Sequence, residues 1–320
     1  MKKLISMLLG VAFVTSQIAA QSRSVTFKFD PSSTSSLSAT TVQAMESNIS
    51  SLLTSINQAY LDKSSLSFEK VSIELQARKN LESLWTNMRF YCENNKYASK
   101  CLNDWQGIQV REIDIKLKGR NDYTGDLDRE LTVSLSKGGT ITGVRMALDN
   151  NEYKKFKDSC SVVTDVRIRN ELLKFVEDFR CYYNEKNIEA LRAVYADDAL
   201  IITGSVMTKQ KTGFDPSVSV KYRKENKEQY LTRLERMFKN KRFIDVQFDR
   251  ISIKRNGAKP DFFGVTLHQD WKTTGYEDHG WLFLLWDFRD KEHPVIHVRT
   301  WQPDQQVDAV GVFDMDDFFF

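Results

Sequence analysis

The 320-residue chain has little proline, little glycine and little net charge. It contains 5 prolines and 14 glycines, with no long low-complexity tract, and its formal net charge is +3. A charge this small gives no long-range field to attract nucleic acid or an anionic membrane. The composition, 41% hydrophobic and 12% aromatic, is that of a globular protein with one large or two ordinary domains.

Recognisable motifs for catalysis and metal binding are missing as well. The sequence has no G-x-S-x-G, no Walker loop and no G-x-G-x-x-G. His293 and His297 are four residues apart, but Pro294 and the surrounding strand pattern prevent the helical face that a zinc-binding pair uses. The basic stretch 221–242 is interpreted as the solvated face of a helix. We therefore expect no metal, no cofactor and no nucleic-acid partner.

The only long apolar run lies at the N-terminus. Lys2 and Lys3 precede a mostly apolar segment, residues 4–14, which is too short to span a bilayer. Small residues up to Ala20 offer a cleavage site, so residues 1–20 are predicted to be a signal peptide. We expect an exported protein, periplasmic or secreted, with no membrane span and a formal charge near +1 after cleavage.

Cysteine is scarce, and the sequence leaves its state open. Four cysteines allow three disulfide pairings, of which the nearest in sequence is Cys92–Cys101 with Cys160–Cys181. An oxidising compartment permits these bonds. Free buried thiols are the alternative.

The first half of the chain has the pattern of an α+β unit, placed at residues 22–155. Hydrophobic periodicity predicts two helices followed by a meander of strands. The expected elements are a strand at 25–29, helices at 42–60 and 81–88, and strands at 108–117, 127–136 and 141–148. A polar stretch at 150–161 is the expected boundary.

The second half, placed at residues 160–305, predicts helices and then long antiparallel strands. The order favours a curved sheet wrapped around helices, with a pocket between them. The first domain is shorter and has a similar element order, so it is interpreted as a candidate degenerate copy of the second. The expected elements are helices at 168–182, 187–195 and 230–238, a short strand at 199–202, an exposed loop at 203–224, and strands at 243–254, 261–271, 280–288 and 295–301.

Several segments of the second half resemble the nuclear transport factor 2-like superfamily, which includes SnoaL-like proteins and ketosteroid isomerase. They are Phe175–Phe179, Tyr182–Ala199, Phe243–Ile253, Thr266–Trp271, Gly280–Phe288 and the ending Val295–Pro303. The resemblance covers residues 164–303 and is nearest to an exported bacterial subgroup without an established activity. It implies an α+β cone, in which an antiparallel sheet wraps around three helices, and a tendency to dimerise through the sheet. The family's catalytic residues have no match here.

Polar side chains on the strands are the candidate ligand-binding residues. Because side chains two apart share one face of a strand, two sets of residues would act together if that face lined the cone. On the strands these are His268 with Asp270, and His297 with Arg299 and Trp301; Tyr182 and Tyr195 could donate from the helices. The alternative is that the strand residues form a cross-strand ladder on a solvated face.

The favoured function is non-enzymatic. We expect an exported cell-envelope protein that binds a small ligand in the cone or a partner protein, with a homodimer through the sheet as a further option. A small-molecule isomerase or hydrolase using the cone is the alternative. The acidic and aromatic tail, residues 306–320, is predicted to be either a final strand at the sheet edge or a docking peptide.

Overall fold

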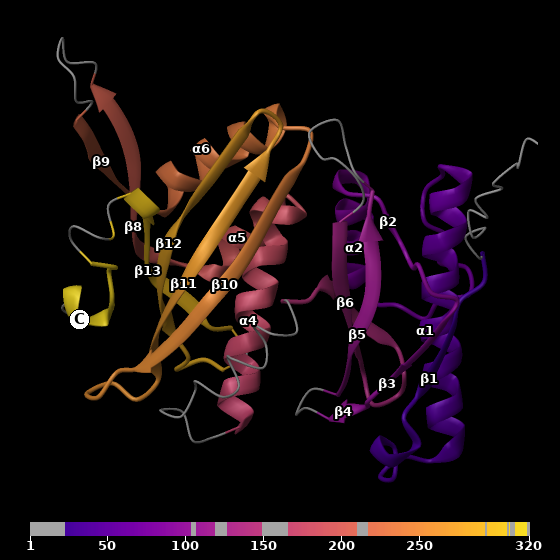
Figure 1. The fold of residues 1–320 in the computed structure, drawn as a ribbon. Helices are drawn as coiled ribbons and strands as arrows, with labels where there is room; N and C mark the ends of the chain where they lie inside the picture. The colour runs from indigo at the N-terminus through magenta and orange to yellow at the C-terminus, as the bar shows by residue number, and fades with distance from the viewer. Residues whose placement is uncertain are drawn as a thin grey trace, which may run out of the picture.

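A computed structural model of the chain describes residues 23–103, 107–118, 127–148, 166–209, 217–291, 293–305, 307 and 311–318 (Figure 1). The predicted signal peptide, the predicted boundary at 150–161 and Cys160 lie outside these residues. No helix in the described part of the chain is long and apolar enough to cross a membrane.

The N-terminal half folds as two helices against antiparallel strands, and its predicted elements are confirmed. Its main sheet has the order β2-β5-β6-β7, with β4 also paired to β5, and a separate pair joins β1 to β3 in parallel. The helices are α1 (Ala39–Asp62) and α2 (Leu75–Asn87). The strands are β1 (Thr26–Phe29), β2 (Phe90–Tyr91), β3 (Lys96–Ser99), β4 (Leu102–Asn103), β5 (Ile108–Leu117), β6 (Leu127–Leu135) and β7 (Ile141–Met146).

The free edge of β1 is satisfied by side chains of α1 rather than by another strand. The backbone N–H groups of Val25, Phe27 and Phe29 donate to Thr54 Oγ1, Ser50 Oγ and Glu46 Oε1, at 3.0, 2.9 and 2.9 Å. Helix residues four apart are about 6 Å apart along the axis. Alternate strand residues are about 6.6 Å apart. The two spacings match closely enough for one helix face to bond every second residue of the strand.

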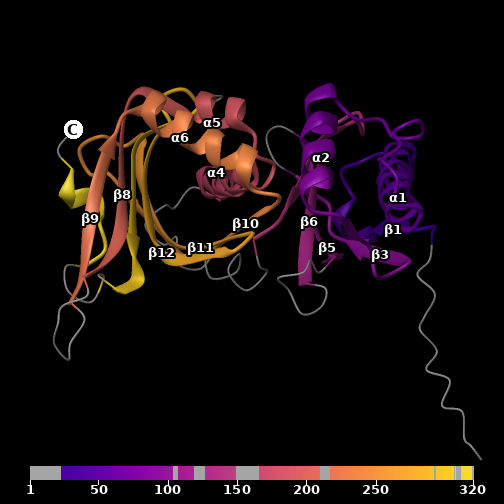
Figure 2. The same cartoon turned by 90° about the horizontal axis from the view of Figure 1, so that it is seen from above.

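The C-terminal half is a six-stranded sheet that curves around three helices (Figure 2). The strand order is β10-β11-β12-β13-β8-β9, and every pairing is antiparallel except that of β13 with β8. The helices are α4 (Val166–Asn184), α5 (Ile188–Val194) and α6 (Lys227–Asn240). The strands are β8 (Tyr195–Lys209), β9 (Ser217–Glu225), β10 (Ile244–Arg255), β11 (Phe262–Thr273), β12 (Tyr276–Asp287) and β13 (Val295–Pro303).

The predicted exposed loop at 203–224 is wrong. β8 runs on to Lys209 and pairs with β9 from Ile201 opposite Glu225 to Lys209 opposite Ser217. The hairpin extends beyond the rest of the sheet (Figure 1). The sequence of β9 does alternate, with Val218, Val220 and Tyr222 separated by polar residues, and this strand signal was missed. Exposed lysine and arginine on the edge strand β9 protect it from pairing with other chains.

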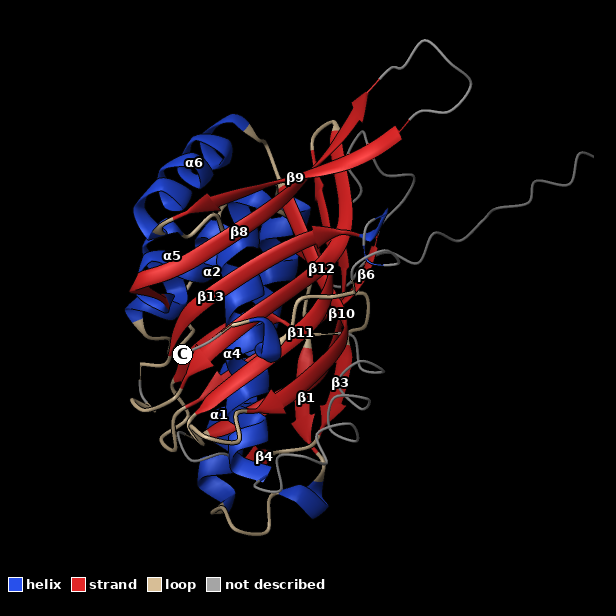
Figure 3. Ribbon diagram, turned by 90° about the vertical axis from the view of Figure 1, so that its left-hand side faces the viewer, coloured by secondary structure: helices blue, strands red, loops and turns tan. Residues whose placement is uncertain are grey.

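The described residues of the C-terminal tail, 307 and 311–318, form no strand and pack on the sheet, so the predicted edge strand is wrong. The tail forms a short 3-10 helix, Met315–Asp317, on the outer face of the sheet (Figure 3). Met315 packs there in an apolar cluster with Phe262, Phe283, Leu285 and Val298. A homodimer through the sheet stays a prediction, and it would have to form around this segment.

The contribution of the tail to stability can be measured by substituting Met315. We expect Met315→Ala to lower the free energy of unfolding by about 2–3 kcal/mol, because Met315 is 6% exposed and its removal leaves a cavity over Phe283. Urea unfolding measures the change. Asp316→Ala, which removes only the exposed ion pair with Lys254, is the control and should change stability by less than about 0.5 kcal/mol. Equal effects of the two substitutions would contradict the packing described.

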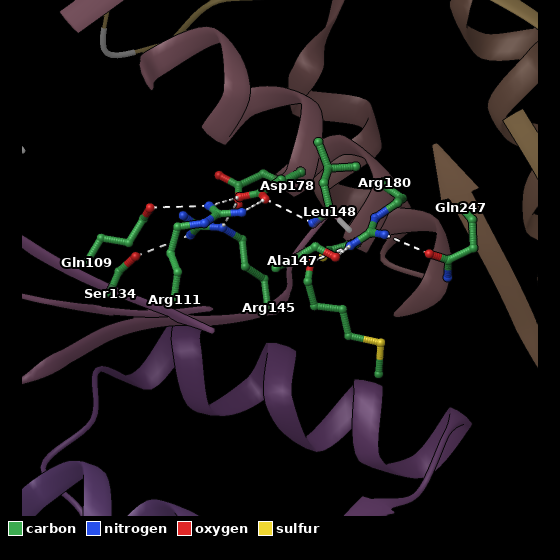
Figure 4. A network of polar contacts seen from close by, with 12 residues as sticks. Gln109, Arg111, Ser134, Arg145, Ala147, Leu148, Asp178, Arg180 and Gln247 are labelled. Atoms are coloured by element: carbon green, nitrogen blue, oxygen red, sulfur yellow. Dashed lines mark hydrogen bonds and ion pairs between the residues drawn. The ribbon is translucent and has the colours of Figure 1, made fainter. Parts of the chain in front are cut away.

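Helix α4 lies on the side of the C-terminal unit that faces the N-terminal sheet (Figure 2), and buried charges join the two (Figure 4). Glu177 accepts from Arg111 Nη1 and Nη2 at 3.0 and 2.5 Å, and from Arg145 Nε at 3.3 Å. Arg180 donates to the Met146 and Ala147 carbonyls. Both Glu177 and Arg180 are fully buried.

Candidate functional site

Most of the cone is filled by the protein's own side chains, but a cavity of about 250 Å³ remains where α6 meets the strands. Its walls come from β8, α6, β11, β12 and β13. The polar and aromatic residues that matter here are Thr203, Tyr230, Gln269, Trp271, Arg299 and Trp301. Leu234 and Met237 of α6 add apolar surface.

Arg299 is the unusual group in this cavity. Its side chain is held by β13, and the residue is only 4% exposed. Nε and Nη1 have no hydrogen-bond partner, and no carboxylate among the described residues lies within ion-pair distance of it. A guanidinium stays protonated in proteins. A buried charge without a counter-ion costs several kcal/mol, so this position is unfavourable even though the guanidinium lies within hydrogen-bonding reach of the Tyr183 hydroxyl.

Three tyrosine hydroxyls lie beneath Arg299. Tyr183 Oη is 3.0 Å from Tyr195 Oη and 2.8 Å from Tyr230 Oη. The Arg299 guanidinium carbon lies 5.2 Å from the centre of the Tyr230 ring. Burial raises the pKa of Tyr183 and of Tyr195, so these hydroxyls stay neutral and do not compensate the charge of Arg299.

Unpaired buried polar atoms gather around the same cavity. Besides Arg299, the lining residues Thr203, Gln269, Thr273 and Trp301 each have one buried side-chain atom without a partner. Buried polar groups in native proteins are nearly always hydrogen-bonded. Most of these atoms are donors, or hydroxyls that can donate. The arrangement is therefore suited to an anion.

Two other charged residues that line the cavity, Arg233 and Asp278, already have partners within the protein. Arg233 binds Glu225 with two bonds of 2.9 and 2.6 Å. Tyr276 Oη donates to Asp278 at 2.6 Å. Burial raises the pKa of Asp278, and the Tyr276 bond only partly offsets it. Asp278 is the one carboxylate among the described residues that line the cavity.

The structure brings Arg299, Trp301 and Tyr195 together in the cone, as predicted from the sequence, but it does not bring His268 and Asp270 there. Gln269 and Trp271 line the cavity, so their neighbours point to the opposite face. On that outer face His268 contacts Asp249 and Asp304 at 2.9 and 3.0 Å. Asp270 accepts from His279. This pair is therefore not in the cone, and its contacts with neighbouring strands agree with the cross-strand ladder considered from the sequence.

His297 does not share a face with Arg299, which corrects the second expected set. β13 pairs Val298 with Leu285 but Ile296 with Trp286, so His297 is the extra residue of a β-bulge. A bulge breaks the alternation of side chains. His297 points outward, where it contacts Asp198 and Asp287 at 2.9 and 3.1 Å.

Tyr182 also lies outside the cone. It lines a different cavity, between α4 and the N-terminal unit. Its neighbour Tyr183 occupies the cone instead, and sequence reasoning missed it. The sequence did contain a signal for Tyr183. Phe175, Phe179 and Tyr183 are four residues apart, which places them on one face of the helix.

Cys92, Cys101 and Cys181 are buried free thiols, which is the second of the two states that the sequence left open. The backbone of Cys92 is bonded to Asn57 in the second half of α1, whereas that of Cys101 is bonded to Ser33, before the start of α1. β3 runs between them as an extended strand and holds them apart. Burial raises the pKa of the Cys92 thiol to about 12.

Across the described residues, no three histidine, cysteine or carboxylate side chains gather closely enough to hold a metal ion. The candidate site in the cone has a cationic and hydroxyl-rich floor beneath apolar walls.

No protein-family model and no curated protein sequence matches this chain. Solved structures of the nuclear transport factor 2-like type are similar to about half of it at low identity. Naphthalene 1,2-dioxygenase has 10% identity and a TM-score of 0.35, covering 52% of this chain and 95% of its own. An NTF2-like family protein from Streptomyces avermitilis has 11% identity and a TM-score of 0.28, covering 48% and 95%. An LEH-like epoxide hydrolase from M. tuberculosis has 15% identity and a TM-score of 0.28, covering 45% and 85%. TM-scores this low assign no function, so function is argued from the residues.

Proposed function

We propose that this protein is a non-enzymatic binding protein that takes a small carboxylate into the cone and acts in the cell envelope after export. The observation that carries the proposal is the charge of Arg299, which has no counter-ion, at the floor of a cavity with apolar walls. A carboxylate would receive charge-assisted bonds from Arg299. Its body would lie against Trp271, Leu234 and Met237.

The size of the cavity limits the ligand. Pockets for drug-sized molecules are typically about 300–1,000 Å³, and this cavity is about 250 Å³. A single aromatic or short aliphatic acid fits that space. The apolar walls favour such an acid over an inorganic anion.

Titration calorimetry with benzoate and its neutral isostere benzamide tests the proposal. We expect benzoate to bind at least about tenfold more tightly, because only the carboxylate compensates Arg299. Arg299→Gln should weaken benzoate binding by about tenfold to hundredfold, the range for hydrogen bonds to charged groups. Arg78→Gln, on the exposed face of α2, is the matched control and should leave binding unchanged. Equal binding of benzoate and benzamide, or no binding of benzoate, would refute the proposal.

The isomerase or hydrolase alternative has one observation in its favour. Asp278 lines the cavity with a raised pKa, as a general acid or base requires. Turnover of an enone or ester that is abolished by Asp278→Asn, in protein that still binds benzoate, would favour this alternative.

A further inference from the structure

A second cavity, also of about 250 Å³, lies between the two halves of the chain. α2 contributes Gln76 and Asn80, β7 contributes Arg145, and α4 contributes Tyr182 and Glu185. Gln76 is exposed and lies at the mouth, whereas Arg145 and Glu185 are 5% and 3% exposed. The cavity therefore has an open polar side and buried charged groups at depth.

Two buried polar atoms of opposite character have no partner in this cavity. Arg145 Nε contacts Glu177 at 3.3 Å, and Nη1 contacts Ser134 at 3.3 Å and forms an ion pair with Asp178 at 3.5 Å, but Nη2 has no hydrogen-bond partner. Oε2 of Glu185 is likewise unpaired. Although one group is a cation and the other a carboxyl, no ion pair joins them. Arg145 and Glu185 therefore line one cavity, and no hydrogen bond joins Arg145 Nη2 to Glu185 Oε2.

The surrounding charges favour a ligand that carries both signs. Arg145 shares Glu177 with Arg111 and also pairs with Asp178, so what it lacks is a hydrogen-bond acceptor at Nη2. Asp178 also lines the cavity, and its proximity adds to burial in raising the pKa of Glu185. A cation between these two carboxyl groups would relieve their repulsion. An anion at Arg145 would complete its pairing.

We propose that this cleft binds a small zwitterion, with the ligand carboxylate on Arg145 Nη2 and the ligand ammonium on Glu185 Oε2. The site is independent of the cone and does not rest on the carboxylate-binding function proposed above. Its walls come from both halves of the chain, so an occupant would join α2 and β7 to α4.

The test uses full-length protein with the cone saturated by benzoate, and repeats the titrations with Arg299→Gln. Glycine, β-alanine and γ-aminobutyrate are the zwitterionic probes, and acetate and methylammonium are the probes with one charge. We expect at least one zwitterion to bind at least tenfold more tightly than either singly charged probe. Glu185→Gln, which keeps the size of the side chain, should weaken that zwitterion at least tenfold and leave acetate unchanged.

Three results would overturn the proposal: no zwitterion binding below 10 mM, acetate binding as tightly as the zwitterion, or an unchanged zwitterion affinity in Glu185→Gln. If that variant fails to fold, a crystal structure of the wild-type protein grown with the tightest zwitterion decides the question. Density between Arg145 and Glu185 supports the site, and an empty cleft refutes it. Benzoate binding can fail without affecting any of these outcomes, since the titrations with Arg299→Gln do not depend on it.

Discussion

Glu177→Gln is expected to lower the free energy of unfolding by about 3–5 kcal/mol, because it leaves Arg111 and Arg145 buried without their shared carboxylate. Urea unfolding followed by circular dichroism measures this change. Glu82→Gln, which breaks the exposed Arg78–Glu82 pair on α2, is the control and should cost less than about 0.5 kcal/mol. A loss at Glu177 no larger than at Glu82 would show that the network is not a buried ion pair in solution.

The same carboxylate gives the protein a defined acid sensitivity. Burial alone would raise the pKa of Glu177, but Arg111 and Arg145 outweigh it and hold the pKa at about 2, below the ordinary 4.5. The ion pair therefore stabilises the folded state fully above pH 4.5 and is lost as the pH falls toward 2. The difference corresponds to about 3 kcal/mol. Between pH 7 and pH 3, the stability of Glu177→Gln should fall less than that of the wild-type protein.

Arg299→Met is expected to stabilise the protein, in contrast to Glu177→Gln, and to raise the free energy of unfolding by about 1–3 kcal/mol. The substitution replaces an unpaired buried cation with an apolar side chain of similar length. Thermal and urea unfolding in the absence of ligand measure the gain. The same variant should lose benzoate binding, so stability and binding are opposed at this position.

Arg180→Met is the matched control for that prediction. Arg180 is equally buried, but its guanidinium bonds the Met146 and Ala147 carbonyls and Gln247. Its removal leaves those acceptors unpaired, so Arg180→Met should destabilise the protein. If both arginine variants destabilised it equally, Arg299 would have a structural role and the cone proposal would lose its main support.

The fold could be read from the sequence where one face of an element is apolar and the other polar. That holds for α1, α6 and strands β10 to β13. The hairpin of β8 and β9 was missed although Val218, Val220 and Tyr222 alternate with polar residues. The helix α4 was predicted, but not its second buried face, because Glu177 and Arg180 look like a solvated face until a second unit covers them.

The candidate site was only partly predictable, for a related reason. Arg299 and Trp301 follow simple alternation along β13. The bulge breaks this alternation, so His297 points to the outer face instead of into the cone. A single extra residue leaves no mark in the composition. That Arg299 has no counter-ion depends on contacts across five elements, which the sequence of one strand does not contain.

The way α1 holds β1 also sets an order of events in folding. β1 precedes both of its partners in the chain: its nearest hydrogen-bond partner, Glu46, lies 17 residues from Phe29, and its strand partner β3 follows later still. Neither partner is local, so we expect β1 to be fixed only after the helix has formed and presents its row of side chains.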